Sequence, residues 1–199
     1  MDQVHIPSKD LPEFKECLYR GKDIADLLQM LNDGFTHTVQ LVAKAGYGKS
    51  TLVSNTCKYL QEREFFAGGI IHLDCAPYGG FLDLLKHLHG SVENMGLLKK
   101  AQTVGQTEAD LLQFLTMLLF QAKVRTLIIL DHAESFKVPL EVKKLVQFID
   151  NVAMANKFVQ FLIVSQVQIE GISSFQLKNL EALSPMQSVE LFFNRRPDF

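Results

Sequence analysis

The chain has 199 residues, of which 47% are hydrophobic, and its formal net charge is −2. This length allows one sizeable core in a single domain or slightly more. The near-neutral charge, without basic runs beyond doublets, predicts that the chain has no nucleic-acid partner. The acidic start is unlike a secretory signal, and the longest apolar stretch, residues 111–120, is too short to span a bilayer. Three widely spaced cysteines suit a reducing compartment, so we expect a cytoplasmic protein that is not embedded in a membrane.

The first informative segment is "LVAKAGYGKSTLV", residues 41–53. It has the form G-x-x-x-x-G-K-[ST], except that Ala43 replaces the first glycine. Residues 38–43 are apolar and β-branched, which predicts a strand, and the apolar residues after Ser50 are spaced as in a helix. Strand, glycine-rich turn and helix in this order predict a phosphate-binding loop.

Each residue type in this loop suits an anionic ligand. Gly46 and Gly48 allow the positive φ angles that bring backbone N–H groups close to a phosphate. Lys49 offers a positive charge to the β and γ phosphates, and the Ser50 hydroxyl suits Mg²⁺. The methyl group of Ala43 lies at the strand end and is a small obstacle. We expect the loop to bind a Mg²⁺-nucleotide through Ala45, Gly46, Tyr47, Gly48, Lys49, Ser50 and Thr51.

Strand and helix patterns alternate along the rest of the chain, which is typical of a parallel sheet covered by helices. The helix predicted at 107–123 is apolar on nearly every side, so we expect it to be buried. Pro185 is expected to open the last helix, in which Val189, Phe192 and Phe193 form an apolar stripe. Further strands are predicted at 67–74, 125–136 running into a polar turn, 158–166 and 175–180, and further helices around Leu82–Leu88 and at 138–156.

The second chemical motif is "LIILDHAES", residues 127–135. Its apolar run ends in Asp131, which places a carboxylate at the carboxyl edge of a parallel sheet, where ligands bind in such folds. We expect Asp131 to help hold Mg²⁺ together with Ser50. Glu134 is the nearby carboxylate able to orient an attacking water, so Asp131 and Glu134 are the catalytic candidates. His132 is a weaker candidate, because a lone histidine in a turn is more often merely exposed.

A metal site formed by histidine, aspartate and cysteine side chains is a further alternative. His72 and Asp74 share one face of a predicted strand, but His87 and His89 are two residues apart on a helix and do not share a face. This spacing disfavours a site built from His72, Asp74, Cys75, His87 and His89.

With these motifs in place, the sequence resembles the STAND class of P-loop signalling ATPases, which includes the NACHT and NB-ARC proteins. The opening segment "YRGKD" is similar to the aromatic-x-Gly-Arg-Glu motif of that class, with Lys22 and Asp23 at the last two positions. The phosphate loop, the aspartate segment and a sensor-like strand with the leucine-rich segment after it are similar as well. These segments occupy residues 19–23, 43–52, 127–135, 161–166 and 177–193.

The resemblance implies a three-layer α/β fold in which a parallel sheet of about five strands, in the order 2-3-4-1-5, has helices on both faces. It implies a lead-in at 1–18, a nucleotide-binding domain at 19–182 and the start of a helical subdomain at 183–199. Gly21 and Lys22 are then expected near the adenine and ribose, and Ser165 near the γ-phosphate. Proteins of this class exchange ADP for ATP when triggered and then oligomerise, so an adenine nucleotide and a protein partner or self-association are expected.

One departure from the class concerns hydrolysis. Members often have an arginine after the sensor serine or threonine, where this chain has Gln166. A neutral amide stabilises phosphate charge less than a guanidinium does, so we expect slow ATP hydrolysis or none. Two alternatives stay open: a degenerate P-loop module that serves only protein interaction, and an ATPase of the origin-recognition type, which the acidic balance disfavours.

Overall fold

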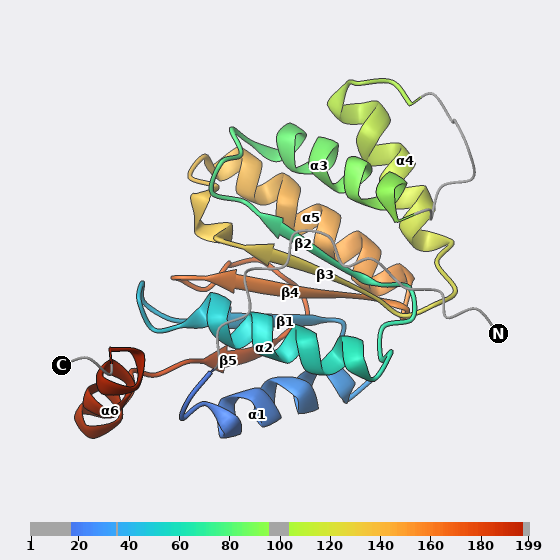
Figure 1. The fold of residues 1–199 in the computed structure, drawn as a ribbon. Helices are drawn as coiled ribbons and strands as arrows, with labels where there is room; N and C mark the ends of the chain where they lie inside the picture. Colours follow the sequence, from blue (N-terminus) through green and yellow to red (C-terminus); the bar gives the residue numbers. More distant parts are fainter. Residues whose placement is uncertain (1–16, 35, 96–103, 197–199) are drawn as a thin grey trace.

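The computed structural model describes residues 17–34, 36–95 and 104–196, and its elements alternate as predicted (Figure 1). The expected lead-in at 1–18 therefore lies almost entirely outside the described residues. The strands are β1 (Thr38–Val42), β2 (Ile70–Asp74), β3 (Thr126–Asp131), β4 (Val159–Ser165) and β5 (Gln176–Asn179). The helices are α1 (Gly21–Asn32), α2 (Lys49–Glu62), α3 (Phe81–Asn94), α4 (Glu108–Phe120), the short 3-10 helix η1 (Ala133–Ser135), α5 (Pro139–Ala155) and α6 (Pro185–Arg195).

The five strands form one sheet in the order β2-β3-β4-β1-β5, and every neighbouring pair is parallel. The expected fold class and strand order are confirmed. Strands β3 and β4 lie inside the sheet and are buried along their whole length, which agrees with their unbroken apolar sequences. The register sets Asp74 beside Asp131, so two carboxylates end neighbouring strands at the same edge of the sheet.

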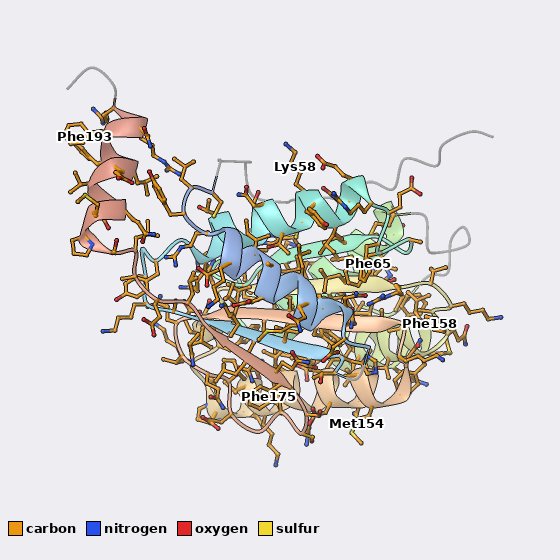
Figure 2. The ribbon with its side chains drawn as sticks, turned by 90° about the horizontal axis from the view of Figure 1, so that it is seen from below. Lys58, Phe65, Met154, Phe158, Phe175 and Phe193 are labelled. Atoms are coloured by element: carbon orange, nitrogen blue, oxygen red, sulfur yellow. The ribbon has the colours of Figure 1, made fainter. Side chains whose placement is uncertain are left out.

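Helices cover both faces of the sheet (Figures 1 and 2). Leu27 of α1 and Leu52 of α2 join the buried cluster on one face, together with alternate residues of the strands. Phe81 of α3, Leu115 of α4 and Leu145 of α5 belong to the larger cluster on the other face. Because a strand directs successive side chains to opposite faces, β4 supplies Leu162 to the first cluster and Phe161 to the second.

Two sequence expectations need correction. The segment at 125–136 is a strand only as far as Asp131, since His132 adopts a left-handed conformation with φ of 55° and a 3-10 turn follows. Helix α4 is not buried all round, because Met117 and Phe120 on its outer side are 49% and 44% exposed. It packs on α3 and α5 rather than between two layers, so one side faces outward.

Helix α6 differs from the other helices in having no buried residue. It begins at Pro185, as expected, and Ser184 and Gln187 close its first turn with a capping box. In both views it stands apart from the three layers, and Phe193 points away from them (Figure 2). Within the described part of the chain, no helix combines the length and apolarity needed to cross a bilayer.

Candidate nucleotide-binding site

The phosphate loop connects β1 to α2 in the conformation that its glycines allow. Gly46 and Gly48 have φ angles of 80° and 88°, in the left-handed region. Apart from its chain neighbours, no atom of the described residues would lie within 4 Å of a Cβ atom on either glycine, so the backbone conformation, and not space, explains these glycines. Ala43 needs no such freedom, because it does not have a positive φ and its N–H donates to the Ser165 carbonyl at 3.2 Å. An alanine is therefore compatible with the loop.

The amino end of α2 provides the anion-binding groups. This 14-residue helix begins at Lys49, and its cap residue, Gly48, makes no side-chain capping bond. The first N–H groups of a helix lack intrahelical partners, and the helix dipole adds positive potential there. The buried Lys49 ammonium donates to the carbonyls of Ala43 and Lys44, at 2.8 and 3.3 Å. Backbone carbonyls of the loop thus fix the position of the Lys49 ammonium.

Asp131 and Ser50 meet at the carboxyl edge of the sheet. The Ser50 hydroxyl donates to Asp131 Oδ2 at 2.9 Å, and the N–H of His132 donates to Oδ1 at 2.9 Å. His72 Nε2 lies 3.6 Å from Oδ2, beyond normal hydrogen-bond distance. Burial raises the pKa of Asp131, but His72, His132 and Ser50 together outweigh burial, so the pKa lies below its usual value. Asp131 is therefore an anion suited to a hard cation.

Glu134 and Gln166 form a direct contact between η1 and the end of β4. The Gln166 side-chain amide donates to Glu134 Oε1 at 2.9 Å. The Gln166 backbone N–H donates to Oε2 at 3.2 Å. The residue that replaces the expected arginine is thus bound to the carboxylate proposed to orient water.

Two cavities flank the phosphate loop. One, of about 420 Å³, lies between the loop and α6 and is lined by Arg20, Tyr47, Gly48, Leu191 and Arg195 among others. The other, of about 410 Å³, lies beside β2 and β3 and is lined by polar groups that include Ser50, His72 and Asp131. The first lies on the α6 side of the loop, and the second lies on the side where Ser50 and Asp131 meet.

The predicted site residues divide into two groups. Lys49, Ser50 and Asp131 come together, and Gly46, Tyr47, Gly48 and Thr51 line the first cavity. Gly21 and Lys22 lie exposed at the start of α1 and do not line it, and Ala45 is exposed in the loop. Ser165 is fully buried, and its hydroxyl donates to the Val167 carbonyl at 2.5 Å, which closes the turn after β4.

Arg20 is a residue that sequence analysis missed. It is only 8% exposed, and its guanidinium donates to the carbonyls of Tyr47 and Glu181 at 3.0 and 2.7 Å. It also pairs with Asp23 at 3.0 Å. One side chain thus joins the phosphate loop, α1 and the segment that leads to α6. Arg20 belongs to the opening motif "YRGKD", but nothing in the sequence indicates that its partners are backbone carbonyls.

The residues present fit a Mg²⁺-nucleotide better than a protein-bound transition metal. A hydroxyl and a carboxylate are the oxygen ligands that Mg²⁺ prefers, and the loop offers donors to phosphates. His72 Nε2 is buried beside them and has no hydrogen-bond partner among the described residues. Among the described residues, no three histidine, cysteine, aspartate or glutamate side chains form a group able to hold a metal ion.

No family model matches the sequence, and neither does any curated protein. Solved structures match by fold. Cdc6p from Pyrobaculum aerophilum has a TM-score of 0.70 at 12% identity, over 100% of this chain and 54% of that one. The Orc1 protein of Aeropyrum pernix in complex with DNA scores 0.68 at 12% identity, over 94% and 51%. Drosophila ORC bound to DNA scores 0.63 at 16% identity, over 91% and 47%. The chain spans about half the length of these proteins.

The comparison corrects one expectation. The net charge of −2 predicts no nucleic-acid partner, and this prediction is wrong as a general rule for the fold, because two of the similar structures contain DNA. The physical reason is that net charge averages over the whole chain, whereas phosphate contacts need only a local group of donors. The sheet order, the phosphate loop and these neighbours agree, and the chain has the three-layer α/β fold of the P-loop ATPases.

Proposed function

We propose that the chain is an ATP- or ADP-binding domain in which a Mg²⁺-nucleotide sits on the phosphate loop. The observation that carries this proposal is the arrangement of Lys49, Ser50 and Asp131 at the uncapped start of α2. Phosphates would bind the N–H groups of Gly46–Thr51 and the Lys49 ammonium. Ser50 and Asp131 would hold Mg²⁺, whose contribution is to neutralise phosphate charge.

The first cavity supports an adenine nucleotide on this loop. Leu183 and Leu191 give it apolar walls, and Arg20 and Arg195 lie at its polar side. In this proposal residues 19–182 are the nucleotide-binding domain, and 183–199 begin a helical subdomain. The cavity is open between the two, so a bound nucleotide would touch both.

We infer that the domain works as a nucleotide-dependent switch with slow hydrolysis. Asp131 and Glu134 provide the groups for water attack, but the residue after β4 is Gln166 and not an arginine. The turnover number should therefore lie well below the ~10 per second typical of enzymes.

The fold neighbours favour a switch of the Cdc6/ORC type. This proposal therefore adds DNA as a partner of the domain. A STAND signalling switch is the second candidate, favoured by the opening motif, whose Arg20 joins the phosphate loop to the segment before α6. Fluorescence anisotropy with labelled duplex DNA separates the two. Binding that requires Mg²⁺-ATP supports the first, and ATP-driven oligomerisation without DNA binding supports the second.

The nucleotide proposal is tested by titrating fluorescently labelled ATP and ADP with Mg²⁺. Lys49→Ala should weaken binding at least 100-fold, because phosphate charge then faces neutral backbone. Ala43→Gly should change affinity little, and Lys58→Ala, on the exposed side of the same helix, is the matched control. Equal affinity of Lys49→Ala and the parent protein would contradict the proposal.

A further inference from the structure

The contact between Glu134 and Gln166 links two neighbouring strands of the sheet at the edge where the phosphate loop lies. Glu134 belongs to η1, which follows β3, and Gln166 directly follows β4. Strand β4 lies between β3 and β1, and β1 leads into the loop. The residue before Gln166 also accepts a hydrogen bond from Ala43, the first residue of the loop. The contact is therefore one residue away from the loop's own attachment to β4.

The geometry of the contact fixes the orientation of the Glu134 carboxylate. Glu134 Oε2 accepts a hydrogen bond from the backbone N–H of Gln166, and Oε1 accepts one from the side-chain amide of the same residue. Two hydrogen bonds to the two oxygens of one carboxylate fix the orientation of its plane, as a bidentate arginine does. A carboxylate that orients water must direct an oxygen lone pair at that water. Both oxygens here are directed at the residue after β4.

The backbone around Glu134 is anchored independently of this contact. The Ser135 hydroxyl donates to the His132 carbonyl, and the Ser135 N–H bonds to the same carbonyl at 2.9 Å. Ala133 is fully buried. Release of the carboxylate therefore requires a rotation of the Glu134 side chain and no rearrangement of η1.

We propose that Gln166 is a positioning residue that holds the Glu134 carboxylate in a resting orientation and so restrains ATP hydrolysis. This inference rests on the proposed function, because it concerns hydrolysis at the same loop. In this proposal Gln166 does more than lack the charge of an arginine, because it binds the Glu134 carboxylate.

Gln166→Leu tests this inference, because leucine is similar in size but has no donor. The turnover number should rise about fivefold, the effect of one net hydrogen bond, while the Kd for Mg²⁺-ATP stays unchanged. Gln168→Leu, two residues along the same turn, is the matched control and should behave as the parent. Thermal midpoints of all variants confirm that they are folded.

The double variant Glu134→Gln with Gln166→Leu shows whether the effect passes through Glu134. No gain over Glu134→Gln alone is expected, because the carboxylate that is released is no longer present. A gain that persists in this background contradicts the inference. So does unchanged or lower turnover of Gln166→Leu in a protein that still binds the nucleotide. Failure of the parent to bind nucleotide would instead overturn the proposed function, and the inference with it.

Discussion

On one side of the phosphate loop, Ser50 and Asp131 are held by α2 and by the buried strand β3, and Asp131 is 2% exposed. On the other side, the wall of the cavity includes Cys17, Leu18 and Arg20 and residues of α6, a helix with no buried residue. The first side is fixed by the core of the sheet. The second side depends on a few long-range hydrogen bonds, those of Arg20 above all.

The two sides therefore differ in how far the fold positions them before any ligand binds. Groups at the ends of buried strands keep their positions because displacing them would disturb close-packed side chains. Groups on an unburied helix are held weakly and can respond to a ligand. We therefore expect the phosphate side to be rigid and the α6 side to be the part that moves with nucleotide.

The largest effect is expected from the rigid side. Asp131→Asn keeps the size of the side chain but removes the charge that Mg²⁺ requires, so hydrolysis should fall on the order of 100-fold. Nucleotide affinity should lose its dependence on Mg²⁺, as a titration with and without chelator would show. Asp110→Asn, on the exposed part of α4, is the control. Retained Mg²⁺ dependence would mean that Asp131 does not serve the cation.

The comparison also separates what the sequence revealed from what it did not. The strand order could be expected from the family resemblance. The positions of Lys49, Ser50 and Asp131 could be predicted from the motifs themselves, because each motif lies at a strand end. Arg20 could not, since its carbonyl partner Glu181 is 161 residues away and backbone acceptors leave no mark in a sequence. The same holds for Gln166, whose pairing with Glu134 depends on β3 and β4 being neighbours.

An intermediate effect is expected from Arg20, which joins the two sides. Arg20→Ala removes its bonds to the carbonyls of Tyr47 and Glu181, and should weaken nucleotide binding about tenfold. Arg20→Lys should not restore affinity, because an ammonium does not reproduce the planar fork. Arg63→Ala, which removes an exposed arginine at the end of α2, should leave affinity unchanged. If Arg20→Lys binds as the parent does, charge alone explains this residue.

The smallest effect on stability is expected from the stripe on α6. Phe192 and Phe193 are 54% and 50% exposed, so Phe192→Glu with Phe193→Glu should change the free energy of unfolding by less than about 0.5 kcal/mol. Nucleotide affinity should also stay the same, and light scattering should show a more monomeric protein, because the charges remove an exposed apolar surface. A large fall in the thermal midpoint would show instead that α6 belongs to the core of the domain.

We propose that a nucleotide occupies the cavity between the phosphate loop and α6. Hydrogen–deuterium exchange with and without Mg²⁺-ADP is the decisive experiment, because backbone amides report on both sides at once. We expect slower exchange in residues 46–52 of the loop and, to a greater degree, in residues 188–195 of α6, with little change in β3 and β4. If exchange in the loop is unchanged at saturating nucleotide, the nucleotide does not bind there.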